Sequence, residues 1–159
     1  VKILVVRCAY SHYGRQFIID YKTGAAVALK NWADARITEP QLPIYAALVS
    51  DDVAAVVFAK VLLDKPGFAG VADEKDILPG VQGVGDEKQK IFDPAEFPDW
   101  IAVVMHWRGR LHVVAREVKA GQAGVMFADE KALQYCEVKP LLRLPERRRL
   151  LAAMASMEA

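Results

Sequence analysis

The longest apolar run in the chain, "VAAVVFAKVLL" at residues 53–63, most constrains what it can fold into. The run is too short to cross a bilayer, which takes about 20 apolar residues, and Lys60 interrupts it. We therefore expect a buried core strand and no membrane partner. The chain has 159 residues, about one domain, and a domain of that size buries roughly two thirds of its surface. It can hold such a core.

The composition is typical of an ordinary globular protein. Hydrophobic residues make up 53% of the chain and charged residues 26%, and the net charge of +1 does not by itself predict a nucleic-acid partner. Cys8 and Cys136 show no paired spacing, which argues against a disulfide framework and favours a reducing, cytoplasmic location. The chain begins with Val1 inside an apolar run, so we expect one domain over residues 1–159 that is a piece of a larger protein.

The first two strands are expected to form a hairpin. Residues 2–7 and 15–22 are rich in β-branched and apolar side chains, and Gly14 between them can take a positive φ. A two-residue turn centred on Tyr13 and Gly14 would place Arg7 opposite Asp20 and Val5 opposite Lys22. This register would bring an arginine onto the aspartate.

Helices are expected on both sides of the apolar strand. Residues 40–50 predict a helix with its prolines in the first turn, and Trp32 is the one large apolar anchor of the connector before it. Residues 98–118 predict the longest helix, and a terminal helix is expected after Pro145. The apolar residues that recur at helical spacing in the long helix are Ile101, Val104, Met105, Leu111, Ala115 and Val118.

The stretch "RQFIIDYKTG", residues 15–24, holds an acid and a base two positions apart. Alternation along a strand places Asp20 and Lys22 on one face with Ile18, and leaves the other face to the core. A carboxylate that helps to hold Mg²⁺, beside an ammonium that orients the attacking water, suits hydrolysis of a phosphodiester. The simpler alternative is a surface ion pair at a strand end.

A second motif follows about twenty residues downstream. In "PQLPIYA", Gln41 and Tyr45 are four residues apart and share one helix face; a core tyrosine beside a solvated glutamine is the simpler alternative. Taken in order, "IIDYKTG", a loop and "PQLPIYA" resemble the RecB-like nucleases of the PD-(D/E)XK superfamily, in particular the nuclease domain of bacterial AddB-like DNA repair proteins. The segments "GFAGVADEKDILPG" and "YCEVKPLLRL" resemble later parts of that domain.

The resemblance implies an α/β fold with a mixed central sheet flanked by helices, a restriction-endonuclease-like core that lacks its N-terminal helices here. Its core motifs fall within residues 3–63 and a helical part within residues 94–159. It implies exonuclease-like, Mg²⁺- or Mn²⁺-dependent cleavage of DNA in repair or recombination, beside a helicase-like upstream region or partner. In residue terms it implies Asp20 as metal ligand, Lys22 as catalytic lysine, and Gln41 and Tyr45 as the residues that position substrate and motif strand.

The chain departs from this pattern at its metal ligands. A second aspartate of the family, on the preceding strand, falls on Val6 or Arg7, and neither can bind Mg²⁺. Further acids of the family would precede Val1, so we expect the chain alone to be inactive. In the expected hairpin register, the Arg7 guanidinium would instead stabilise the Asp20 carboxylate much as a metal would.

The C-terminal part departs as well. Three positions of the family's iron–sulfur motif read Leu133, Cys136 and Leu142 here, so no cluster is expected and the leucines should replace it by packing. Nearby, "RLPERRR" offers a basic surface for a DNA backbone, although a solvated helix end would look the same; its arginines are Arg143, Arg147, Arg148 and Arg149.

Three hypotheses remain open from the sequence. The first is metal-dependent cleavage of DNA. The second is a catalytically degenerate nuclease-like domain that binds DNA or acts as a scaffold in a larger repair protein. The third is an unrelated α/β domain with a chance motif.

Overall fold

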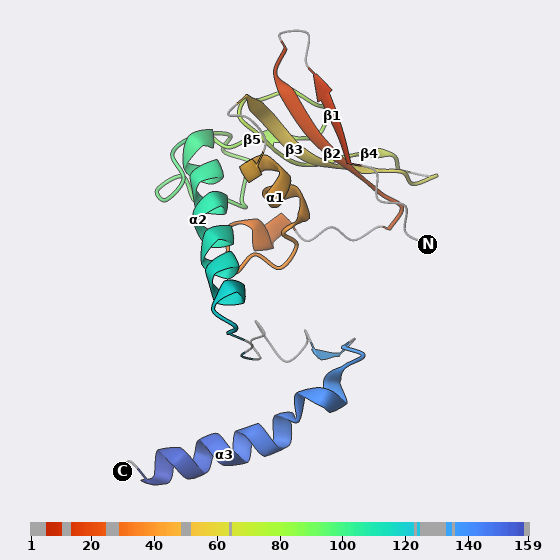
Figure 1. Cartoon of the computed structure of the whole chain (residues 1–159). Helices are drawn as coiled ribbons and strands as arrows, with labels where there is room; N and C mark the ends of the chain where they lie inside the picture. Colours follow the sequence, from red (N-terminus) through yellow and green to blue (C-terminus); the bar gives the residue numbers. More distant parts are fainter. Residues whose placement is uncertain are drawn as a thin grey trace. The chain divides into compact units, whose positions relative to one another are not determined.

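The computed structural model describes residues 6–10, 14–24, 29–48, 52–63, 65–122, 124, 133–134 and 136–157. By its contacts the chain divides into two compact units, residues 1–116 and residues 117–159, and each is described by itself below. The first unit is of the α/β class, with helices packed on a mixed sheet (Figure 1). Within the described ranges, no helix combines the length and apolar character that a bilayer span requires.

The sheet has five strands whose spatial order follows the chain, β1-β2-β3-β4-β5. The pairs β1–β2 and β3–β4 are antiparallel, whereas β2–β3 and β4–β5 are parallel. The expected hairpin and the expected buried strand are confirmed, and every residue of the central strand except its last is buried. The strands are β1 (Val6–Tyr10), β2 (Gln16–Lys22), β3 (Val53–Lys60), β4 (Gly67–Ala72) and β5 (Gln82–Gly83).

The connection between the parallel strands β2 and β3 is helical, as such a crossover usually is. It contains the 3₁₀ helix η1 (Leu29–Trp32) and the helix α1 (Gln41–Leu48), which packs against both strands. The predicted placement of prolines at the start of this helix is confirmed. Pro40 precedes it and its carbonyl accepts from the Ile44 amide at 2.8 Å, so the missing proline amides leave no helical bond unmade.

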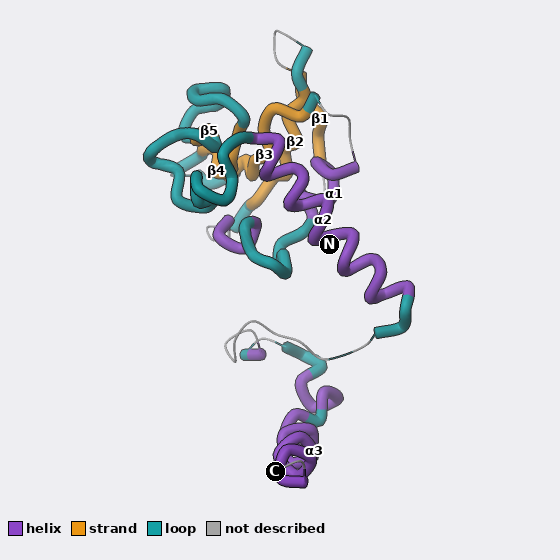
Figure 2. Tube along the Cα trace, turned by 90° about the vertical axis from the view of Figure 1, so that its left-hand side faces the viewer, coloured by secondary structure: helices purple, strands orange, loops and turns teal. Residues whose placement is uncertain are grey.

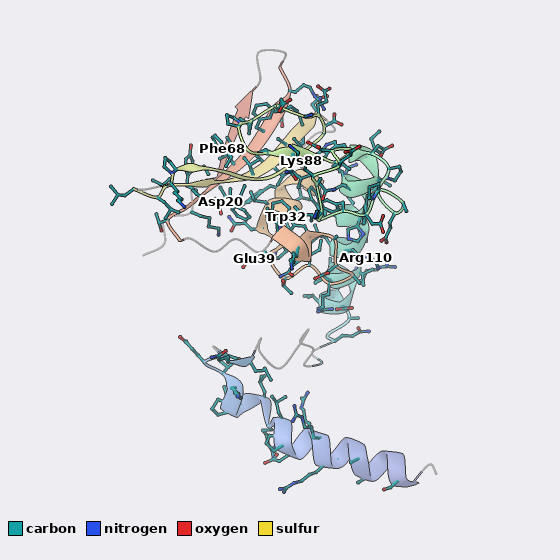
Figure 3. All side chains as sticks on the ribbon, turned by 180° about the vertical axis from the view of Figure 1, so that it is seen from behind. Asp20, Trp32, Glu39, Phe68, Lys88 and Arg110 are labelled. Atoms are coloured by element: carbon teal, nitrogen blue, oxygen red, sulfur yellow. The ribbon has the colours of Figure 1, made fainter. Side chains whose placement is uncertain are left out.

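The sheet buries apolar side chains on both faces. On the helix face, η1, α1 and α2 cover a core that is rich in aromatic side chains (Figure 2). On the loop face, smaller side chains of β2, β3 and β4 pack under the segment that follows β4. Figure 3 shows Asp20 and Trp32 on one side of the strands and Phe68 on the other.

The helix α2 (Trp100–Lys119) is the longest, as predicted. Its buried stripe is Trp100, Val103 and Trp107, whereas four of the apolar residues at helical spacing are exposed: Ile101, Met105, Ala115 and Val118. The indoles explain the difference because each finds a buried acceptor. Trp100 Nε1 donates to the Val53 carbonyl at 2.6 Å and Trp107 Nε1 to the Trp32 carbonyl at 3.0 Å.

The loop face relies on close backbone approach. A Cβ added to Gly70 would lie 2.2 Å from the Val56 carbonyl oxygen and 2.7 Å from Val57 Cα. A side chain at this position would therefore force β4 away from β3.

The second unit contains the 3₁₀ helix η3 (Lys139–Leu142) and the predicted terminal helix, α3 (Leu144–Met157). Leu133 is buried, while Cys136 and Leu142 are half-buried and the Cys136 thiol is free. Arg143 caps η3 in the left-handed conformation, with φ of 49°.

Candidate functional site

The motif residues of β2 lie on the helix face. Ile18 belongs to the core of that face, and Phe17 and Ile19 to the core of the loop face, so the predicted alternation is confirmed. The expectation that one face would be left for the charges is wrong. Asp20 is only 1% exposed and shares the helix face with Ile18, and α1 packs against the same strand.

Two apolar positions flank Asp20 across the sheet. The register pairs Asp20 with Val6 on β1 and with Phe58 on β3. The predicted pairing of Asp20 with Arg7 is therefore wrong by one residue, and Arg7 pairs with Ile19 instead.

The cause of this slip is the length of the hairpin connection. Tyr10 pairs with Gln16, so residues 11–15 connect the strands instead of a two-residue turn. A shift of one residue moves a position to the other face of a sheet, and position 7 thus joins the Ile19 row. The predicted stabilisation of the Asp20 carboxylate by the Arg7 guanidinium rested on the other register and is not supported. Val5, which was expected opposite Lys22, lies outside the described residues.

Lys22 reaches back to the buried carboxylate. Its Nζ lies 3.2 Å from Asp20 Oδ2 and 5.0 Å from the centroid of the Phe58 ring. The Lys22 side chain is 32% exposed, against 2% for that of Asp20, so the ammonium joins a buried acid to the protein surface. The simpler alternative, a surface ion pair, is therefore wrong, because Asp20 is buried.

The α1 motif residues lie over the same face. Tyr45 is half-buried against the helix-face core, as expected of a packing tyrosine, whereas Gln41 is not simply solvated. Its Nε2 is buried and has no hydrogen-bond partner, and Asp20 Oδ2 likewise accepts no hydrogen bond from the described residues. Buried polar atoms of this kind are few in folded proteins, and two of the predicted site residues carry one.

A divalent cation does not fit the described side chains at this place. Mg²⁺ requires near-octahedral coordination by oxygen atoms, and no group of three His, Cys, Asp or Glu side chains suited to a metal occurs among the described residues. At the motif itself Asp20 is flanked by Val6 and Phe58, so it is the single carboxylate of its row.

The predicted basic surface lies in the second unit. Arg147, Arg148 and Arg149 are exposed on α3, and Arg143 is exposed at its start, where it forms an ion pair with Glu146. Consecutive helical residues are about 100° apart around the axis, so three adjacent arginines point in different directions. Only part of the basic run can contact one phosphate backbone at a time.

Phe58 is the site residue that sequence reasoning missed. It supplies the ring beneath the Lys22 ammonium, and it is the β3 partner of Asp20. The only sequence signal was its place in the apolar run, because a pairing register between strands that are far apart in the chain is not encoded in either strand alone.

One titratable group beside the crossover has a shifted pKa. His106 Nε2 lies 3.2 Å from the Asp34 carbonyl oxygen, and its ring meets the edge of Phe97 at a centroid distance of 5.1 Å. Partial burial lowers the pKa of His106 below its ordinary value of 6.5, and the nearby Arg110 acts in the same direction. The hydrogen bond to the Asp34 carbonyl acts in the opposite direction, so the lowering of this pKa comes mainly from burial.

Comparison with known proteins adds nothing to this geometry. No family model matches the chain, and neither a curated protein nor a solved structure does.

Proposed function

We propose that the chain is a catalytically degenerate, nuclease-like domain that binds DNA without cutting it. The restriction-endonuclease-like core is part of this proposal. It is supported by the strand motif Asp20-x-Lys22, by the helix that carries Gln41 and Tyr45, and by the parallel strand to which that helix leads. A mixed sheet flanked by helices is what the resemblance to RecB-like nucleases implies.

The observation that carries the non-cleaving reading is the setting of Asp20. The carboxylate is buried, and the sheet positions on either side of it are Val6 and Phe58. Neither can supply the second oxygen ligand that the resemblance implies for this row. The described residues therefore favour binding over hydrolysis.

The DNA-binding part of the proposal is supported by the exposed arginines of the second unit. Lys and Arg contacts to phosphates displace counterions, and this gives sequence-independent affinity that falls with salt. The stretch of α3 that contains Arg147, Arg148 and Arg149 has this chemistry. We also propose that the domain works beside a helicase-like region or partner, as the resemblance implies for DNA repair proteins.

Metal-dependent cleavage of DNA is the second candidate, and one observation favours it. Asp20 Oδ2 and Gln41 Nε2 are both buried without a hydrogen-bond partner, and both belong to the predicted site. Orphaned polar atoms at motif residues are typical of sites that complete their hydrogen bonds with a ligand.

A binding and cleavage experiment separates the two candidates. The chain is mixed with labelled single- and double-stranded DNA, and fluorescence anisotropy is recorded with EDTA or with Mg²⁺ or Mn²⁺, while intact DNA is quantified on gels. The proposal expects salt-dependent binding that EDTA leaves unchanged, with no loss of intact DNA. Replacing Arg147, Arg148 and Arg149 by Gln should reduce the salt slope by about 0.7 to 0.9 for each phosphate that these arginines neutralise.

Two outcomes would contradict the proposal. Metal-dependent cleavage that both Asp20→Ala and Lys22→Ala abolish would establish the second candidate. Absence of measurable binding to either form of DNA would remove the DNA-binding function itself.

A further inference from the structure

We propose that Lys22 is the built-in counter-ion of Asp20, and that its ammonium stands where a nuclease of this kind would hold a divalent cation. The site would then be neutral and complete without metal. This inference goes beyond the proposed function, because it concerns the charge balance of the core and holds whether or not the chain binds DNA.

The first step is that the buried charge of Asp20 needs compensation. A carboxylate that is 1% exposed is almost entirely shielded from water, and a buried charge is tolerated only when an opposite charge or several hydrogen bonds compensate it. Its Oδ2 accepts no hydrogen bond from the described residues. Among the described residues, the compensation found for this oxygen is the charge of Lys22.

The second step is the position of the cation that meets this demand. Lys22 Nζ lies 3.2 Å from Asp20 Oδ2, which is ion-pair distance, although its direction does not make a hydrogen bond. Because residues two apart on a strand share a face, the strand itself holds the two charges together. No movement of another element is needed to form the pair.

The third step is what fixes the ammonium in place. The centroid of the Phe58 ring lies 5.0 Å from Nζ, within the range of a cation–π interaction. Phe58 is also the β3 partner of Asp20, so one aromatic side chain supports both members of the pair. The aliphatic part of Lys22 stays against the sheet while its charge reaches the surface.

These contacts give Lys22 a different role from the one that the resemblance implies. The ammonium balances a buried carboxylate, and this is a structural function that the resemblance does not imply. The pair also blocks the approach of a second cation, because a divalent ion on Oδ2 would lie next to the ammonium. A lysine already present in the motif thus takes the place of the missing acid and its metal.

The test is a double-mutant cycle on the whole chain. Asp20→Asn and Lys22→Met each remove one charge at nearly constant shape, and thermal unfolding followed by circular dichroism gives Tm. Lys22→Met leaves the buried Asp20 charge alone and should lower Tm on the order of 10 °C, whereas Asp20→Asn should lower it less because the remaining ammonium reaches the surface. The double variant should recover at least half of the summed decrease, because it leaves no buried charge uncompensated.

Lys60→Met is the matched control. Lys60 is the β3 partner of Lys22 in the register and is half-buried like it. Its effect should add to that of Asp20→Asn without coupling. Lys22→Arg, which keeps the charge, should retain most of the wild-type Tm.

The metal arm uses Mg²⁺ and Mn²⁺ alone as probes. Millimolar amounts of either should leave the wild-type Tm unchanged relative to EDTA, and electron paramagnetic resonance should find no Mn²⁺ that depends on Asp20. Additive effects in the cycle would overturn the proposal. So would a metal-dependent rise in wild-type Tm that Asp20→Asn abolishes. If the Asp20→Asn variant is poorly folded, Asp20-dependent binding is replaced as the criterion by the wild-type chain alone, in which any bound Mn²⁺ in the resonance spectrum contradicts the proposal.

Discussion

The two faces of the sheet are built in different ways. The helix face holds large aromatic side chains whose indole N–H groups donate to backbone carbonyls, and rings in edge-to-face contact join η1, α2 and the segment before α2. The loop face has Phe17 and Ile19 from β2, but its other buried side chains are alanine and valine, and the segment that follows β4 covers it. Its strands β3 and β4 also approach closely at Gly70.

The difference explains where a buried acid can be accommodated. On the helix face, the Phe58 ring lies 5.0 Å from the Lys22 ammonium, which pairs with Asp20. On the loop face the backbone of β4 lies so close to β3 that a single Cβ would not fit at Gly70. The motif aspartate therefore lies on the face where its charge can be balanced.

The largest expected effect comes from removing a ring from the helix face. Trp107 is fully buried and contacts Trp32, Phe92 and Trp100. Trp107→Ala should lower the free energy of unfolding by about 3 to 5 kcal/mol, because it leaves a cavity and an unpaired carbonyl. Chemical denaturation measures this decrease. Met105→Ala, on the exposed side of the same helix, should stay within about 0.5 kcal/mol; equal decreases would show that the aromatic core is not what stabilises this face.

The next effect tests close packing on the loop face. Gly70→Ala should cost about 1 to 3 kcal/mol, since the new Cβ would overlap the Val56 carbonyl and β4 must shift. Gly67→Ala is the control in the same strand, because its Cβ would meet nothing within 4 Å. Denaturant midpoints of the two variants should differ clearly. If they coincide, the tight β3–β4 approach is not a constraint on the fold.

A smaller effect is expected from the ion pairs between the residue before β2 and the segment after β4. Arg15 forms ion pairs with Asp73 at 2.5 Å and with Glu74 at 3.2 Å, and all three side chains are at least partly exposed. Arg15→Gln should lower stability by about 0.5 to 1 kcal/mol, a value reduced by solvent screening. The decrease should shrink in high salt. Lys75→Gln, exposed in the same segment, should change Tm little in either condition.

The smallest effect concerns the pH dependence of the helix face. The lowered pKa of His106 means that the unfolded chain binds its proton more readily than the folded one. The contribution of neutral His106 to the stability of the fold is therefore complete above about pH 6.5. It is lost as pH falls through that value toward the lower pKa of the folded state. His106→Gln should flatten the curve of Tm against pH between about 5 and 8, by roughly 1 °C because the ring is only half-buried. A steeper curve in the variant would refute the assigned sign.

Local patterns in the sequence predicted the elements well. The apolar run gave β3, the prolines marked the start of α1, and alternation placed Asp20 and Lys22 on one face. Each of these depends on residues within one strand or helix, and their periodicity is a local property.

The register and the burial of the site depend on distant segments. The position of Arg7 followed from an assumed turn length, and one residue of error moved it to the other face. That Asp20 is buried depends on helices which fold over β2 from later in the chain. On α2 the aliphatic residues at helical spacing form the more regular pattern. The buried face is nevertheless the one with Trp100 and Trp107, because large indole side chains bury more surface.

The placement of the tryptophans has a spectroscopic consequence. All three tryptophans of the sequence, Trp32, Trp100 and Trp107, are buried in the helix-face cluster of the first unit. Intrinsic fluorescence excited at the indole band therefore reports on that cluster alone, with emission shifted to the blue of free tryptophan. Far-ultraviolet dichroism includes the helix α3 as well, so the two signals report on different parts of the chain without any label.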